Sequence, residues 1–146
     1  MSKKKQSRLA AFESLSAVLT GFSLADIQGT GLAATYLKKV DEFVEGDQLN
    51  ELFGSFLQLK IDPSAELDLR QKMAVAELME HDRFGSMMRT IIEIWYAGHM
   101  PAPDGSIISS RAYIEGLVWR AIAAHPMGAK QPGFGTWAFP PDTFTY

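Results

Sequence analysis

The stretch SRLAAFESLSAVLTGF, residues 7–22, decides the fold class. Its large apolar side chains recur at steps of three and four residues: Leu9, Phe12, Leu15, Leu19 and Phe22. Such steps place side chains on one face of an α-helix, whereas a half-buried strand alternates at every second residue. We therefore predict a helix over residues 7–20 that ends at Gly21, because glycine is common just beyond the end of a helix.

The next segment predicts two further helices with the same spacing. Asp26 is expected to cap the first, which runs to about Gly46 although Gly29 and Gly31 weaken its first turns. The second is short and follows Asp47. The side chains expected to face inward are Leu32, Tyr36, Val40 and Phe43 in the first helix, and Leu49, Leu52, Phe53, Phe56 and Leu57 in the second.

The run IDPSAELD, residues 61–68, carries the clearest helix start in the chain. Asp62 suits the N-cap, Pro63 the first helical position and Glu66 the first turn. We predict a helix from there to about His81. Its inward face is expected to hold Leu67, Met73, Ala76 and Leu78.

Two helices are expected in the remainder, separated by the loop MPAPDGS at residues 100–106. The first begins near Ser86 and stops at Gly98, and its apolar side chains are Met88, Ile91, Ile92, Trp95 and Tyr96. The second is capped by Ser109 or Ser110, and its apolar side chains are Tyr113, Leu117, Val118 and Ile122. The sequence thus predicts an all-α bundle of five or six helices over residues 1–125, with residues 1–6 flexible. An extended arm over residues 126–146 follows.

Composition restricts the classes of function. The 146 residues are 47% hydrophobic with a net charge of −3, which gives no electrostatic reason to expect nucleic acid as a partner. The absence of cysteine excludes disulfides and thiol ligation of metals. No apolar run is long enough for a membrane span, so no direct insertion into a membrane is expected.

No constellation of residues predicts chemistry. His81, His99 and His125 are too far apart in sequence for two of them to share one helical face as metal ligands. Each lies near a predicted helix end, where a histidine interacts favourably with free carbonyl groups. Gly29-Thr30-Gly31 lacks the lysine and the preceding strand of a phosphate-binding loop. We predict no catalytic, cofactor-binding or metal-binding residue, and no cofactor bound by this chain.

Aromatic residues are more informative. Trp95 and Tyr96 are adjacent, about 100° apart on a helix, so both cannot face one narrow core stripe. Tyr113 and Trp119, in YIEGLVW, are likewise expected to be spread around their helix. One interpretation is an aromatic core within a small domain. The other is that these helices bury one face on their own domain and a second face on a partner.

The C-terminal segment KQPGFGTWAFPPDTFTY, residues 130–146, shows neither a helical nor a strand period. Prolines limit the entropy that an extended arm loses on ordering, and each docked ring buries on the order of 150–250 Å². The arm can dock on its own helices or on a second protein. We favour the second protein, because aromatic surface of this kind is typical of interfaces.

These motifs resemble the small subunit of bacterial FAD-dependent sugar and polyol dehydrogenases. That family includes the small subunits of sorbitol, fructose, gluconate and glucose dehydrogenases and of glycoside 3-dehydrogenases. The motifs that carry the resemblance, in chain order, are FESLSAVLTG (12–21), IIEIWYAG (91–98), YIEGLVW (113–119) and KQPGFGTWAFPP (130–141). The second and fourth together are the more specific.

The resemblance implies a non-catalytic subunit that binds and stabilises a large flavoprotein of the glucose–methanol–choline type. FAD and the catalytic histidine would belong to that partner, and some such complexes add a cytochrome c subunit. The expected interface residues of this chain are Trp95, Tyr96, Gly98, Trp119, Pro132, Gly133, Phe134, Trp137 and Phe139. The competing interpretation is a free-standing helical enzyme or ligand-binding module whose pocket is lined by the same aromatic residues.

Two features depart from the family. Its members commonly begin with a twin-arginine export signal, whereas this sequence begins MSKKKQSRLAAFES. We therefore expect a cytoplasmic complex, or a periplasmic one if a twin-arginine signal is missing from this sequence. Some members also carry a cysteine before the arm. The corresponding region here is AAHPMGAKQPGF, so attachment would be non-covalent.

Overall fold

The computed structural model describes residues 3–101 and 105–123, and this part of the chain is all-α, as predicted. It holds eight helices, and its only extended pairing is an isolated antiparallel bridge between His99 and Ile107. The chain divides into two compact units, residues 1–92 and 93–146. The predicted C-terminal arm, residues 126–146, lies outside the described residues.

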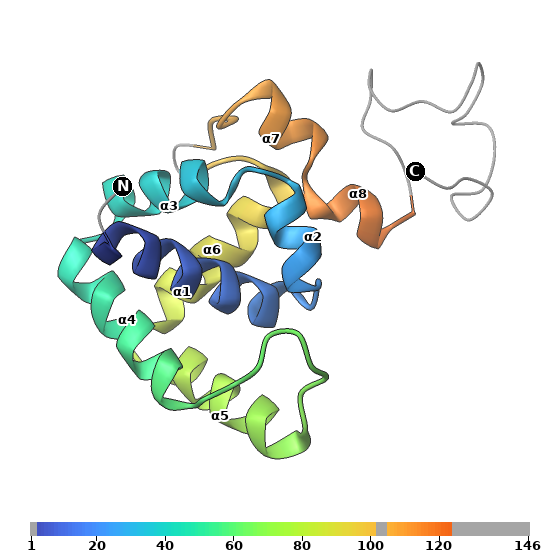
Figure 1. Cartoon of the computed structure of the whole chain (residues 1–146). Coiled ribbons are helices and arrows are strands. Elements are labelled where there is room, and N and C mark those ends of the chain that lie inside the picture. The colour runs from blue at the N-terminus through green and yellow to red at the C-terminus, as the bar shows by residue number, and fades with distance from the viewer. Residues whose placement is uncertain (1–2, 102–104, 124–146) are drawn as a thin grey trace. The chain divides into compact units, whose positions relative to one another are not determined.

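The first unit is built on α1 (Lys3–Thr20), which contacts each of the next three helices (Figure 1). These are α2 (Leu24–Gly29), α3 (Ala33–Phe43) and α4 (Gly46–Gln58). The unit also contains α5 (Leu69–Glu80) and most of α6 (Gly85–Ala97), which continues into the second unit. Its largest fully buried side chains are Phe12, Leu15, Ile27, Tyr36, Leu49, Leu52, Met88 and Ile91.

The helix predicted over residues 7–20 is confirmed as α1, although it begins earlier, at Lys3. It ends where predicted, because Gly21 adopts a positive φ of 78° and its N–H bonds to the carbonyl of Ala17 at 3.0 Å. Thr20 is buried, and its hydroxyl donates to the carbonyl of Ser16 at 2.8 Å. The opening stretch is thus the helix around which the first unit is assembled.

The single helix predicted from Asp26 to about Gly46 is wrong, because the chain breaks at Gly31 into α2 and α3. Gly31 has a φ of 68°, outside the helical region. The cap of α2 is Ser23, whose hydroxyl accepts from the N–H of Asp26 at 3.0 Å. Phe43 was expected to face inward, yet it is 46% exposed because it lies in the last turn of α3. Leu57, near the end of α4, is likewise about half exposed.

The helix predicted to start at Asp62 is also wrong in its first turn. Asp62 instead accepts from the N–H of Ser64 at 2.8 Å in a local turn, and α5 begins only at Leu69. Asp68 and Gln71 form the cap, each side chain bonding to the other's backbone N–H, at 2.8 and 3.0 Å. A reciprocal capping box satisfies two free donors, whereas a lone aspartate satisfies one, so the later start prevails.

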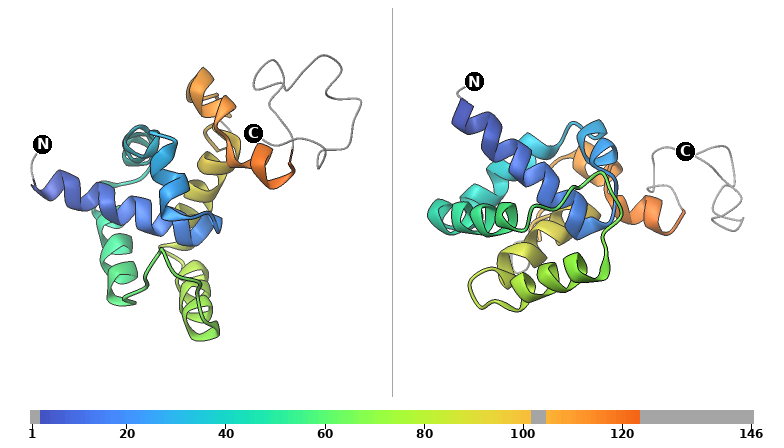
Figure 2. Two further views of the ribbon diagram at one scale, coloured as in Figure 1. Left: turned by 45° about the vertical axis from the view of Figure 1, so that its right-hand side comes forward. Right: turned by 60° about the horizontal axis from the view of Figure 1, so that its bottom comes forward.

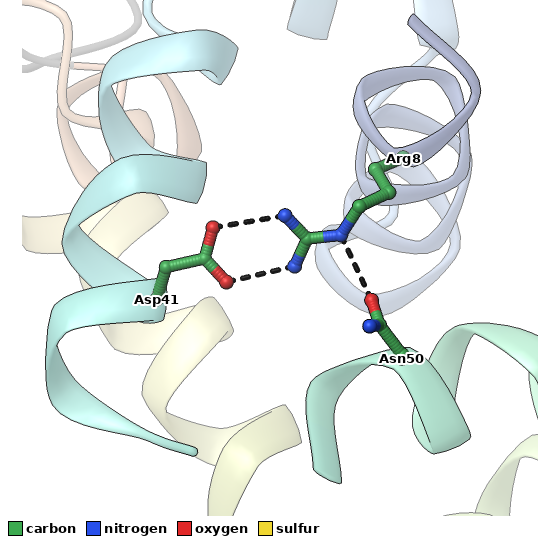
Figure 3. A network of polar contacts seen from close by, with 3 residues as sticks. All are labelled: Arg8, Asp41 and Asn50. Atoms are coloured by element: carbon green, nitrogen blue, oxygen red, sulfur yellow. Dashed lines mark hydrogen bonds and ion pairs between the residues drawn. The ribbon is translucent and has the colours of Figure 1, made fainter. Parts of the chain in front are cut away.

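One polar cluster joins three helices of the first unit (Figure 3). Arg8 of α1 donates two hydrogen bonds to the Asp41 carboxylate of α3, at 2.7 and 3.1 Å. Its Nε donates to Asn50 Oδ1 of α4 at 2.8 Å, and its guanidinium lies 5.9 Å from the ring centre of Phe53. The bond to Asp41 raises the pKa of Arg8 above its ordinary value, opposed in part by burial and aided by the charge of Asp41. A planar, bidentate pair fixes the approach of α1 and α3 more tightly than a lysine would.

In the second unit, the single last helix predicted from Ser109 or Ser110 to Ile122 is wrong. It is split into α7 (Ser110–Ile114) and α8 (Leu117–Ala121), and Gly116 is the N-cap of α8. Ser109 does cap α7, since its hydroxyl accepts from the N–H of Ala112 at 3.0 Å. Ile122, expected on the apolar face, is about half exposed beyond the end of α8.

Candidate functional site

The predicted interface residues that the structure describes lie at the end of α6 (Trp95, Tyr96 and Gly98) and in α8 (Trp119). Gly98 ends α6 with a φ of 70°, and its N–H bonds to the carbonyl of Ile94 at 2.9 Å. A Cβ atom at Gly98 would overlap the backbone carbonyl of Ala112 in α7. Gly98 is therefore required both for its backbone conformation and for the close approach of α7.

A second glycine brings the other side of this site together. A Cβ at Gly116 would lie 2.8 Å from the carbonyl oxygen of Tyr96, a distance that real Cβ atoms essentially never show. The break between α7 and α8 thus packs directly on the last turn of α6. Sequence reasoning placed Gly98 in the site but missed Gly116, although a glycine in the middle of a predicted helix marks either a break or a close contact.

Backbone hydrogen bonds join the residues just after α6 to those just before α7. The N–H of Met100 bonds to the carbonyl of Ser106 at 2.8 Å, and that of Ile108 bonds to the carbonyl of Gly98 at 3.0 Å. These bonds flank the bridge between His99 and Ile107. Residues 106–108 thus lie beside residues 98–100, and Ser109 follows in place to cap α7.

Trp95 and Tyr96 differ in burial, as adjacent residues on a helix should. Trp95 is only 1% exposed and belongs to the core of this chain. Tyr96 is half-buried. Of this pair, Tyr96 is therefore the more exposed residue.

Tyr113 and Trp119 were expected on separated faces of one helix, and this expectation is wrong. Because the chain breaks at Gly116, their rings meet edge to face, with centres 5.6 Å apart and planes at 77°. The indole Nε1–H of Trp119 donates to the carbonyl of Tyr113 at 2.9 Å. Both side chains are half-buried, so the pair is held in one orientation while part of it faces outward.

The described histidines have local partners at helix ends. His81 caps the end of α5, accepts at Nδ1 from the N–H of Arg83 at 3.2 Å, and stacks on Phe84 with ring centres 4.7 Å apart. His99 follows α6, with Nδ1 2.9 Å from the carbonyl of Met100 and 3.9 Å from a carboxylate oxygen of Glu93. His125 lies outside the described residues. Over residues 3–101 and 105–123, no three potential ligands gather as a metal site would require.

Two grooves of the first unit are lined mainly by aliphatic and polar side chains. One of about 390 Å³ lies between the end of α1 and the loop before α5, and Phe22 is its one aromatic lining residue. Another, of about 270 Å³, lies between α1 and α3 beside Arg8 and Asp41.

The remaining predicted interface residues, Pro132, Gly133, Phe134, Trp137 and Phe139, lie outside the described residues. Among the helices that are described, none combines the length and apolarity needed to cross a bilayer. Comparison of the chain with known protein families, curated proteins and solved structures gives no match.

Proposed function

We propose that this chain is a non-catalytic subunit that binds and stabilises a larger FAD-dependent carbohydrate or polyol dehydrogenase. The observation that carries the proposal is the aromatic and proline-containing segment at residues 130–146, together with the three upstream motifs of the same resemblance. The partner would hold FAD and perform the oxidation, and a cytochrome c subunit would complete some complexes. This chain would contribute binding surface and no reacting group.

The structure supplies a physical reason for two of the motifs. An added Cβ at Gly98 of IIEIWYAG would meet the backbone of Ala112 in α7, and one at Gly116 of YIEGLVW would meet the carbonyl of Tyr96 in α6. Their close contact fixes Tyr96, Tyr113 and Trp119 on one local framework. A rigid aromatic group loses little entropy on binding, which makes it a suitable anchor.

The mechanism we propose is stabilisation by mass action. A subunit that binds only the folded flavoprotein lowers the concentration of its unfolded form, by a factor that grows with the ratio of subunit concentration to Kd. The aromatic segment at residues 130–146 would cover apolar surface on the flavoprotein. The same contacts would hold the complex together through assembly without a covalent link, since the chain has no cysteine.

Deletion of residues 133–146 tests the proposal. The tagged full chain should co-purify with a protein that contains FAD and that oxidises sugars with a dye acceptor, and the deletion should abolish this co-purification. Deletion of residues 1–5, which removes the basic N-terminus, is the matched control and should leave the complex intact. A complex that survives the first deletion with full activity would refute the role of the segment. A purified chain that oxidises sugars alone, as a stable monomer, would establish the competing interpretation.

A further inference from the structure

Helix α5 presents an apolar stripe to solvent. None of its residues is buried, and Leu69 and Met73 are 74% and 58% exposed. With Ala76 they are spaced four and three residues apart, so the three side chains lie on one face. In Figure 1 and in both views of Figure 2, α5 lies at the lower margin of its unit. The sequence predicted Met73 and Ala76 on the inward face, and both are exposed instead.

An open groove continues this stripe toward the end of the helix. It measures about 420 Å³ and is lined by Met73, Ala76, Glu77, Glu80 and His81. Its lining thus combines the apolar Met73 and Ala76 of mid-α5 with the carboxylates Glu77 and Glu80 of the last turn. The stripe and the groove together occupy one face of the helix along its length.

The charges of α5 run against the helix dipole. Arg70 and Lys72 lie in the first turn, and Glu77 and Glu80 lie in the last. A helix favours acidic residues at its start and basic residues at its end, so within the helix this order is unfavourable, although the N-cap Asp68 is favourably placed. Over the described residues, no ion pair to any of these four side chains offsets the arrangement.

The same order of charge is complementary to itself when a second copy of the helix is antiparallel. We propose that α5 is the contact between two copies of this chain. The two copies are related by a twofold axis that passes between their α5 helices, level with the midpoint of Met73 and Ala76. Leu69, Met73 and Ala76 follow the 4-3 spacing of a coiled-coil seam, and Glu80 lies at its end. The axis sets Met73 against Ala76 of the second copy, and it brings the basic half of each helix beside the acidic half of the other. Antiparallel dipoles add to this preference.

The size of the stripe sets the strength expected of the dimer. Twelve residues of helix span about 18 Å. One helix pair of that length buries less than a standard interface, so the dimer is weak, with a Kd on the order of 10⁻⁵–10⁻⁴ M. The inference is independent of the proposed function, because it concerns contacts between copies of this chain alone.

Sedimentation of the full chain over a range of concentrations tests the dimer. We expect the mass of wild type to rise toward that of two chains. Met73→Glu should raise Kd by about a hundredfold or more, because it places a like charge and an unpaired carboxylate on both sides of the seam. The matched control is Phe43→Glu, since Phe43 is also about half exposed but lies at the end of α3. The control should sediment as wild type does.

Charge inversion tests the antiparallel arrangement. Arg70→Glu with Lys72→Glu makes α5 wholly acidic, and Glu77→Lys with Glu80→Lys makes it wholly basic. Each double variant alone should dimerise at least about tenfold more weakly than wild type, and an equimolar mixture of the two should recover the dimer. If the chain stays in solution only with its proposed partner, sedimentation is measured on the co-purified complex instead. A complex with two copies of each chain then indicates the dimer, and a complex with one copy of each indicates its loss.

Three outcomes would overturn the proposal. One is a wild-type chain that stays monomeric up to about 1 mM. Another is a set of charge variants whose mixture associates no better than either variant alone. The third is a loss of flavoprotein binding in Met73→Glu with no change in self-association, which would assign the stripe to the partner protein instead.

Discussion

A methyl group added at Gly98 perturbs the contact between α6 and α7 in two separable ways. Gly98 has a φ of 70°, a conformation that costs a residue with a side chain about 1–2 kcal/mol. The new Cβ also overlaps the backbone carbonyl of Ala112, and overpacking of this kind typically costs about 1–3 kcal/mol. Alanine restricts the unfolded chain, which returns about 0.4–1 kcal/mol. We expect Gly98→Ala to lower the free energy of unfolding by about 2–4 kcal/mol.

Two other glycines separate these contributions. Gly21 has a φ of 78°, but no atom lies within 4 Å of the place that an added Cβ would take. Gly21→Ala therefore carries only the conformational cost and should lower stability by about 1 kcal/mol. Gly116 has a negative φ, and its Cβ would meet the carbonyl of Tyr96, so Gly116→Ala carries mainly the steric cost, about 1–3 kcal/mol.

Denaturant titration followed by far-UV circular dichroism and by tryptophan emission measures all three variants. The expected order of destabilisation is Gly98→Ala first, then Gly116→Ala, then Gly21→Ala. A free energy of unfolding for Gly98→Ala within about 0.5 kcal/mol of that of wild type would refute this prediction, because changes that small are usual for surface substitutions. It is also refuted if Gly21→Ala is as damaging as Gly98→Ala, since the contact with Ala112 would then contribute nothing.

Two further predictions concern the first unit. A double-mutant cycle on Arg8→Ala and Asp41→Ala should give a coupling energy of about 1 kcal/mol, because the pair is bidentate and partly buried. Because the pKa of Arg8 is raised, the stability that its charge contributes is fully present at any pH below the ordinary pKa of an arginine. It is lost only as the pH rises above that value. The coupling energy should therefore not change between about pH 6 and pH 9. A fall in coupling across that interval would contradict this assignment. Asp68→Ala should weaken α5 by about 1 kcal/mol, seen as roughly fivefold faster amide exchange along the helix, whereas Asp62→Ala should have less than half that effect. Equal effects of the two substitutions on amide exchange would contradict the assignment of Asp68 as the cap of α5 in place of Asp62.

Local chemistry made several helices predictable. The starts or ends of α1, α4 and α6 fall close to the predicted positions, because apolar side chains at three- and four-residue steps continue up to a residue that stops the helix. Ser109 was correctly named among the possible caps of α7, since its short hydroxyl chain suits that position. The candidate site was predictable only in part. Gly98 and the adjacent aromatic residues stood out in the sequence, but the role of Gly116 did not.

The errors arise where two local preferences compete. Asp62-Pro63 and Asp68 with Gln71 are both valid helix starts, and the reciprocal hydrogen bonds of the second pair prevail. The capping box was visible in the sequence and could have corrected the start of α5. At Gly31 the alternatives were a continuous helix and a break into α2 and α3. The sequence did not decide between them, because glycine weakens a helix without requiring it to end.

The sequence by itself determined that the described chain is all-α, because periodicity is a property of neighbouring residues and needs no distant contact. Only the tertiary structure decided which apolar residues are covered. Met73 satisfies the helical pattern as well as Phe12 does, yet Phe12 is fully buried and Met73 faces solvent. The pattern fixes which residues share a face of a helix, and the packing of other helices decides whether that face becomes core or surface. The pairing of Tyr113 with Trp119 has the same origin, since it required a break at Gly116 beside the carbonyl of Tyr96.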